Sequence, residues 1–258
     1  MHSKTENIIV GSTGFVGQTL MGDISFHYAF NSRNIQDLED CPDGCNLYLS
    51  CLPATKWKVN QNLVEDIENI NNLISILKKK RYARVYLIST IDVYGDSPHG
   101  VDEDYSPNYS GLNYGSNRLM FESLVKNYLE YEKYYVFRLP ALYGRGLKKN
   151  IIFDLMNNNQ VEKINLNTKF QWYDMQDLSK DICEFTYHNP DAEVFNLYPE
   201  PVLTLDIVER FFPEKKCSGG IPFGYDFRTK YNETGYIYDK EVTLKKLARF
   251  LDNDASTR

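Results

Sequence analysis

The sequence is poor in the residues that build metal sites and disulfide frameworks. Its five cysteines lie at 41, 45, 51, 183 and 217, an odd number without paired spacing. No second cysteine or histidine pair accompanies Cys41 and Cys45, and the four histidines are scattered. We therefore expect reduced thiols and no bound metal ion.

The sequence has neither an excess of positive charge nor a long apolar run. The net charge of −6 argues against binding to nucleic acid or to an anionic lipid surface. No segment is long enough to span a bilayer, and the first predicted strand begins too early to leave room for a signal peptide. These absences predict a cytoplasmic protein with no nucleic-acid or membrane partner.

A glycine-rich turn near the start is the most informative feature that is present. The β-branched run Ile8–Val10 leads into three glycines at G-x-x-G-x-x-G spacing, and an apolar helical pattern follows. This order predicts a strand, a tight turn and a helix N-terminus, whose N–H groups and dipole suit a pyrophosphate. An ordinary strand-to-helix turn is the alternative. The predicted dinucleotide contacts here are Gly11, Ser12, Thr13, Gly14, Phe15, Val16 and Gly17.

Strand-like and helix-like stretches alternate through the first half of the chain. We therefore expect an α/β protein with a Rossmann-like, doubly wound parallel sheet, trimmed between the second and third strands. The alternation decays near Gly146, which predicts a dinucleotide-binding domain at 1–145. A smaller substrate-binding lobe, with some strands returning to the main sheet, is predicted at 146–258. The predicted strands are 26–30, 46–51, 85–89 and 134–139, the predicted helices are 59–80, 114–131 and 240–251, and residues 252–258 are expected to fray.

Three stretches are expected to meet at the carboxyl ends of the parallel strands, where ligands bind in such sheets. The first is the glycine turn. The second is Leu87–Gly95 (LISTIDVYG), at the end of a buried strand. The third is Tyr114–Arg118 (YGSNR), which opens a helix and places residues 114 and 118 on one helix face.

These motifs, in this order, resemble the extended short-chain dehydrogenase/reductase family of nucleotide-sugar epimerases, 4,6-dehydratases and 4-keto reductases. The resemblance covers most of the chain and includes RLPALYG at 138–144, WYDMQDL at 172–178 and VFNL at 194–197. It implies that Tyr114 is the general acid/base and that Thr90 hydrogen-bonds the reacting oxygen. The cation at 118 would hold the nicotinamide ribose and lower the tyrosine pKa. A free tyrosine titrates near ~10, so a base at neutral pH requires such a cation.

The sequence departs from the family pattern at two positions. Arg118 stands where the family has lysine, and its wider, planar head makes the exchange non-conservative. We interpret it as an active variant; lost activity, or a plain surface pair with Tyr114, are the alternatives. Ile91 and Asp92 follow Thr90 where the 4,6-dehydratases have adjacent acids, so keto reduction or epimerisation is favoured over elimination. Asp92 contacts substrate or is a capping residue.

The segment after the predicted strand 26–30 indicates which cofactor the protein prefers. No carboxylate ends the stretch 26–30, and Asn31, Ser32 and Arg33 follow it. Their hydroxyl and guanidinium suit a 2′-phosphate, so we favour NADP(H) over NAD(H). The further predicted cofactor contacts are Cys51, Leu52, Pro53, Tyr114, Arg118, Leu139 and Pro140.

Cations at two places predict an anionic substrate. Arg145, Lys149 and Asn150 stand where family members hold a nucleotide diphosphate, although a solvated loop is equally consistent. Lys56 either reaches the substrate or covers the sheet edge.

We favour NAD(P)-dependent reduction of a keto group on a nucleotide-linked deoxysugar. The alternatives are a nucleotide-sugar epimerase with tightly bound NAD and a catalytically silent dinucleotide-binding protein. The resemblance also suggests a homodimer paired through the helices within 59–80 and 114–131, although the residues do not fix the oligomer.

Overall fold

The computed structural model describes residues 5–255, which form two compact units. The first unit contains the described residues up to Ser97, with Ser106–Arg138 and Leu178–Phe195. Its six-stranded sheet has the order β2-β1-β3-β4-β5-β9, and β1–β2, β1–β3 and β3–β4 pair in parallel. The strands are β1 Asn7–Val10, β2 Tyr28–Phe30, β3 Cys45–Leu49, β4 Arg81–Thr90, β5 Glu130–Leu139 and β9 Val194–Asn196.

The strand order confirms the predicted Rossmann-like α/β fold and its trimmed sheet. β2 is an edge strand, and a single 3-10 helix, η1 (Ile35–Asp40), is the only element between β2 and β3 in the chain. A full doubly wound sheet places another strand outside this edge. The helices of the first unit are α1 Phe15–Asp23, α2 Lys56–Gln61, α3 Leu63–Leu77, α4 Tyr114–Tyr128 and α6 Leu178–His188, with the 3-10 helix η2 at Ile91–Tyr94.

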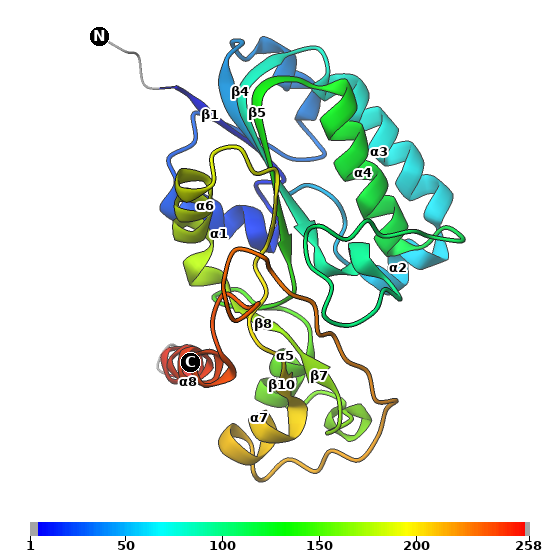
Figure 1. Cartoon of the computed structure of the whole chain (residues 1–258), viewed down its shortest axis with the longest axis vertical. Helices are drawn as coiled ribbons and strands as arrows, with labels where there is room; N and C mark the ends of the chain where they lie inside the picture. The colour runs from blue at the N-terminus through cyan, green and yellow to red at the C-terminus, as the bar shows by residue number, and fades with distance from the viewer. Residues whose placement is uncertain (1–4, 256–258) are drawn as a thin grey trace. The chain divides into compact units, whose positions relative to one another are not determined.

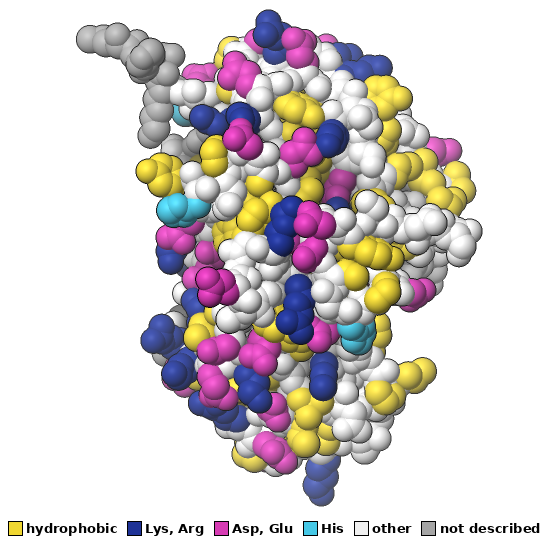
Figure 2. Space-filling model, in the orientation of Figure 1, with side chains coloured by type: hydrophobic (Ala, Val, Ile, Leu, Met, Phe, Trp, Pro, Cys, Tyr) yellow, Lys and Arg dark blue, Asp and Glu magenta, His cyan; other side chains and the backbone are white. Residues whose placement is uncertain are grey.

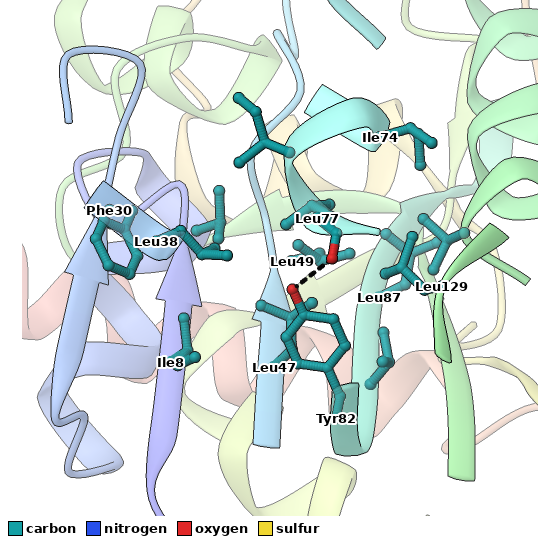
Figure 3. Close-up of a cluster of buried hydrophobic side chains, with 14 of the residues drawn as sticks. Ile8, Phe30, Leu38, Leu47, Leu49, Ile74, Leu77, Tyr82, Leu87 and Leu129 are labelled. Atoms are coloured by element: carbon teal, nitrogen blue, oxygen red, sulfur yellow. Dashed lines mark hydrogen bonds between the residues drawn. The ribbon is translucent and has the colours of Figure 1, made fainter. Parts of the chain in front are cut away.

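Helices cover both faces of this sheet (Figure 1). α3 packs against α4 over one face, and α1 packs against α6 over the other. Strand alternation decides which side chains each face receives. Leu47 and Leu49 enter the apolar core on the α3–α4 side, shown in Figure 3. There the Tyr82 hydroxyl donates a 2.9 Å hydrogen bond to the carbonyl of Leu77, the last residue of α3.

Aromatic rings line the other face of the sheet. Tyr48 and Tyr86 are partners on β3 and β4, and their ring centroids stack 4.4 Å apart. Tyr86 stacks on Tyr135 at 5.6 Å, and Tyr135 lies 6.4 Å from the ring of Phe195. These tyrosines therefore pack the interior of the first unit, which accounts for part of the chain's high tyrosine content.

The first unit departs from the predicted helices in two places. Residues 59–80 do not form one helix, because α2 and α3 are separated at Asn62, whose φ of −145° and ψ of 68° are not helical. The Asn62 amide donates to the Glu65 carboxylate, and asparagine favours such side-chain bonds at helix ends. α4 ends at Tyr128, earlier than the predicted residue 131, and the side chain of this last residue is 60% exposed.

The second unit contains Pro98–Tyr105, Leu139–Asp177 and the described residues from Asn196 onward. Glu103 joins the first of these segments to the last, since its carboxylate accepts from the Asn196 and Lys230 N–H groups and from the Thr229 hydroxyl. β6 pairs in parallel with β8, and β7 pairs antiparallel with β10. The elements are β6 Ala141–Tyr143, α5 Ile151–Asn157, η3 Val161–Lys163, β7 Lys169–Phe170, β8 Trp172–Asp174, η4 Met175–Asp177, β10 Val202–Leu203, α7 Thr204–Phe211 and α8 Lys240–Ala255.

The last helix is longer than the predicted 240–251. α8 continues to Ala255, so residues 252–255, expected to fray, are helical, while 256–258 lie outside the described residues. The buried side chains of Leu247 and Phe250 anchor its later turns in the apolar core of the second unit.

Charges of both signs are mixed on the face of the molecule in Figure 2. Within residues 5–255, no helix combines the length and apolar character that a membrane span requires.

Candidate functional site

The glycine turn between β1 and α1 is shaped by close backbone approaches. Gly11 has a φ of +97°, and a Cβ built on it would lie 2.4 Å from the Ser50 carbonyl oxygen. A Cβ on Gly17 would lie 2.1 Å from the Gly11 carbonyl oxygen. Neither position accepts a side chain without backbone movement, which is the reason for glycine at both.

Gly14 differs from these two glycines. A Cβ built on it would lie 3.4 Å from its nearest atom, the Gly11 carbonyl oxygen, which is an ordinary van der Waals contact. It is the N-cap of α1 in an extended conformation and makes no side-chain cap bond. The first turn of a helix leaves N–H groups without intrahelical acceptors. The turn thus has the open backbone and helix dipole that fit a dinucleotide pyrophosphate.

The space around Gly17 and Gly22 predicts opposite effects of alanine at the two positions on the free energy of unfolding. We expect Gly17→Ala to lower the free energy of unfolding by about 1–3 kcal/mol through overpacking. Gly22→Ala is the matched control in the same helix, because a Cβ there meets nothing within 4 Å, and it should raise stability by up to ~1 kcal/mol. Urea unfolding followed by circular dichroism measures both, and equal stabilities would contradict this account.

The loop after β2 carries the residues predicted to select the cofactor. Asn31 accepts from the Arg33 N–H at 2.9 Å, and the Asn31 N–H donates to the Asn34 side chain at 2.8 Å. Ser32 and Arg33 are exposed. The Ser12 hydroxyl joins this strand end to the glycine turn by donating to the Phe30 carbonyl at 3.0 Å. The two predicted segments therefore lie together at the carboxyl edge of the sheet.

The segment after β3 reaches the helix that carries the tyrosine. The Pro53 carbonyl accepts a 2.8 Å hydrogen bond from Arg118 Nη2. Burial raises the pKa of Cys51 to about 12, so its thiol is neutral at physiological pH. Leu52 is half-buried. The hydrogen bond to the Pro53 carbonyl therefore holds Arg118 beside the end of β3.

The start of α4 is fixed by a capping box and by a close approach. The Asn113 side chain accepts from the Ser116 N–H, and the Ser116 hydroxyl oxygen accepts from the Asn113 N–H. A Cβ on Gly115 would lie 2.0 Å from the Asp92 carbonyl oxygen, so only glycine lets α4 touch η2 this closely. The Tyr114 N–H donates to Asn60 of α2 at 2.8 Å. Tyr114 is thereby placed at the carboxyl end of β4.

Arg118 lies over Tyr114 and is held by a buried carboxylate. Its Cζ is 4.5 Å from the centroid of the Tyr114 ring. Its Nη1 and Nη2 donate to the two Asp66 carboxylate oxygens at 2.8 and 3.2 Å, and Asp66 also accepts from the Asn117 amide at 2.9 Å. The predicted pair therefore occurs as a three-residue group in which Asp66, from α3, is the unpredicted member.

Tyr114 is buried, and this burial raises its pKa above the ordinary value. Arg118 lowers the pKa, whereas the carboxylates of Asp92 and Asp66 raise it. Burial is the largest of these effects, so the phenol carries its proton at neutral pH.

Thr90 and Asp92 lie at the end of β4, on the strand-to-η2 turn. The Thr90 hydroxyl oxygen accepts from the Asp92 N–H at 3.2 Å and caps η2, which leaves its own proton for another acceptor. The Asp92 carboxylate binds Lys56 Nζ at 2.6 Å, and its carbonyl accepts from the Tyr109 hydroxyl at 2.7 Å. The structure thus brings together four predicted residues: Lys56, Thr90, Asp92 and Tyr114.

A second buried ion pair lies beside this strand end. Glu122 and Arg138 form a bidentate pair, with 2.7 and 3.1 Å between nitrogen and oxygen. The Ser89 hydroxyl donates to Glu122, and Arg138 Nη1 donates to the Tyr94 hydroxyl at 2.9 Å. These bonds fix Ser89, directly before Thr90, and Tyr94, four residues after it.

The other predicted contacts fall in the second unit. Leu139 and Pro140 are buried, and Arg145 and Lys149 are exposed. Both polar atoms of the Asn150 side chain serve the fold, since the amide donates to Leu142 and the oxygen caps α5 at Phe153. Partial desolvation lowers the pKa of Lys149. Their role toward a substrate diphosphate stays a prediction.

Sequence reasoning missed Asp66, Asn60 and Glu122. Asp66 had a detectable signal, because it lies three residues after Leu63 and four before Ile70, within the apolar stripe of the predicted helix. A carboxylate in such a stripe needs a buried partner. Asn60 had no comparable signal.

The fold and the site define a Rossmann-type α/β protein whose glycine turn, tyrosine and threonine meet at the carboxyl edge of a parallel sheet. A model of the NAD dependent epimerase/dehydratase family matches residues 46–197, more than half of the chain. The chain therefore belongs to the NAD dependent epimerase/dehydratase family. The matched residues begin after the glycine turn. The close backbone approaches of Gly11 and Gly17 describe that turn without the family model.

Several solved structures share this fold at low sequence identity. MoeE5 in complex with UDP-glucose and NAD is 15% identical, with a TM-score of 0.78 over 98% of this chain and 100% of that one. The UDP-N-acetylglucosamine 4-epimerase from Methanobrevibacter ruminantium M1, in complex with UDP-N-acetylmuramic acid, is 13% identical with a TM-score of 0.74 over 99% of each chain. The dTDP-4-dehydrorhamnose reductase from Yersinia enterocolitica is 13% identical with a TM-score of 0.72 over 96% and 99%. No curated protein matches the sequence.

Proposed function

We propose that the protein is an NAD(P)-dependent oxidoreductase that reduces a keto group on a nucleotide-linked sugar. The observation that carries the proposal is the buried Tyr114 phenol, which burial keeps protonated, at the start of a helix whose Gly115 lies against Asp92, two residues after Thr90. Reduction of a ketone to an alcohol needs one proton at the oxygen. A phenol that keeps its proton at neutral pH has that proton to give, and it cannot accept another until it is deprotonated.

The residues of the first unit divide the reaction between them. The glycine turn would hold a reduced nicotinamide dinucleotide, which would supply the hydride for the reduction when bound. Thr90 donates its hydroxyl proton in a hydrogen bond to the carbonyl oxygen, which polarises the C=O bond. Tyr114 then transfers its proton to that oxygen, which completes the alcohol, and the phenol regains a proton from solvent. The N–H groups at the N-terminus of α1 would bind the pyrophosphate of that dinucleotide.

The charge state of Tyr114 favours reduction over epimerisation. An epimerase of this kind must first remove a proton from an alcohol and later return one, so its tyrosine has to act as a base. Burial and two carboxylates raise the pKa of Tyr114, which disfavours that first step at neutral pH. We therefore place reduction first and epimerisation second.

The direct test is an assay on the purified protein. NADPH and NADH are each mixed with dTDP-4-dehydrorhamnose, and the loss of reduced nicotinamide absorbance is followed. UDP-glucose and UDP-N-acetylglucosamine are incubated in parallel, and their 4-epimers are sought by chromatography. Oxidation of NAD(P)H with the keto sugar supports reduction, whereas epimer formation with a cofactor retained through purification supports the alternative.

We propose NADP(H) as the preferred cofactor because Ser32 and Arg33 are exposed after β2. Arg33→Ala should weaken NADPH binding by about 10- to 100-fold and leave NADH binding unchanged, since a charge-assisted hydrogen bond contributes ~1.5–3 kcal/mol. Calorimetric titration with each dinucleotide measures this. Arg84→Ala, another exposed arginine, is the control. Equal losses for both dinucleotides would contradict the preference.

A catalytically silent dinucleotide-binding protein is the second candidate. The pairing of Arg118 with Asp66 favours it, because this cation is engaged within the protein. Tight dinucleotide binding without turnover of any of the three nucleotide sugars would support this candidate.

A further inference from the structure

The buried group around Arg118 is closed by hydrogen bonds. Arg118 and Asp66 side chains are only 5% and 4% exposed, and two hydrogen bonds join them. Three of the five guanidinium N–H donors are used by Asp66 and the Pro53 carbonyl. Asn117 adds a further donor to the carboxylate. The cation and its counter-ion are therefore buried together, on α4 and α3.

We infer that Asp66 is a positioning residue, which holds Arg118 as half of a neutral ion pair and so withholds net positive charge from the Tyr114 phenol. The inference rests on the proposed role of Tyr114 as proton donor. A lone guanidinium 4.5 Å from the ring would favour the tyrosinate, whereas a bidentate pair presents little net charge. Asp66 thereby keeps the phenol in the form that reduction requires.

The other charged groups around Tyr114 are balanced in a similar way. Asp92 of η2 faces it, and Lys56 of α2 binds this carboxylate at 2.6 Å. Cys51, after β3, is a neutral thiol. Tyr109 donates to the Asp92 carbonyl, and burial raises the pKa of its phenol, which is therefore neutral. Removing the Asp66 charge therefore leaves Arg118 as an uncompensated cation beside the phenol.

The experiment is a titration of Tyr114 itself. The protein is labelled with ¹³C at tyrosine Cζ, and the Tyr114 resonance is assigned by its absence from Tyr114→Phe. In Asp66→Asn the pKa of Tyr114 should fall by about 1–3 units relative to wild type. The alkaline limb of the reduction rate should move to lower pH by the same amount. An unchanged Tyr114 pKa in this variant would overturn the inference.

A second variant covers a failure of Asp66→Asn to fold. The double variant Asp66→Asn/Arg118→Gln removes both charges, and the inference expects a Tyr114 pKa equal to that of wild type. A rise of about 1–3 units would show that Arg118 acts as a free cation and would overturn the inference. These titrations need neither cofactor nor substrate. Their failure is thus distinguishable from failure of the proposed reaction, which the turnover assay decides.

Discussion

Replacing Tyr114 by phenylalanine is expected to lower turnover of the keto sugar by about 10²–10⁴-fold, the usual contribution of a positioned general acid. The ring remains, so its packing under Arg118 and the start of α4 should be kept. Loss of the hydroxyl removes the proton donor and leaves the glycine turn untouched. Dinucleotide affinity should therefore fall much less than kcat, since the Tyr114 hydroxyl is only one of the predicted cofactor contacts.

Stopped-flow absorbance of NAD(P)H and calorimetric titration of the dinucleotide provide these two measurements. Tyr128→Phe is a matched control, because it deletes a tyrosine hydroxyl from the same helix at an exposed position. It should leave both quantities unchanged. Full activity of Tyr114→Phe would exclude the tyrosine as proton donor and end the proposed mechanism.

The parts of the fold that follow from local pattern were predictable. The glycine turn precedes a helix and follows a strand as expected, because Gly11 and Gly17 permit approaches that no other residue allows. The short stretch between β2 and β3 has no room for another strand, and the sheet lacks one there. Tyr114 and Arg118 share a helix face because four residues separate them.

The partner of Arg118 could not be read from the same pattern. Asp66 lies 52 residues away in the sequence, and only the packing of α3 against α4 brings the two side chains together. The break at Asn62 was missed because the apolar spacing continues across it. Tyr128 follows the helical spacing of the buried positions yet is exposed, since the chain leaves α4 at that residue. The first of these features depends on a tertiary contact, and the other two depend on where the helices begin and end.

The Glu122–Arg138 pair predicts a large stability effect in the first unit. Its side chains are 8% and 6% exposed, and the carboxylate accepts from Arg138 twice and from Ser89. Glu122→Ala removes the carboxylate that balances a buried guanidinium, and such a loss costs about 3–5 kcal/mol. We expect urea unfolding to show this decrease. Glu193→Ala, which deletes one partner of the exposed pair with Lys126, should cost less than ~1 kcal/mol.

The double variant Glu122→Leu/Arg138→Met separates charge balance from packing. Replacing a buried pair by apolar side chains of similar size is often neutral in stability, so this variant should recover most of the loss. Because Ser89 and Tyr94 would lose their partners, the end of β4 that bears Thr90 should still be less well fixed. The double variant should then fold like wild type but reduce the keto sugar more slowly. Recovery of full activity would show that this network stabilises the fold without positioning Thr90.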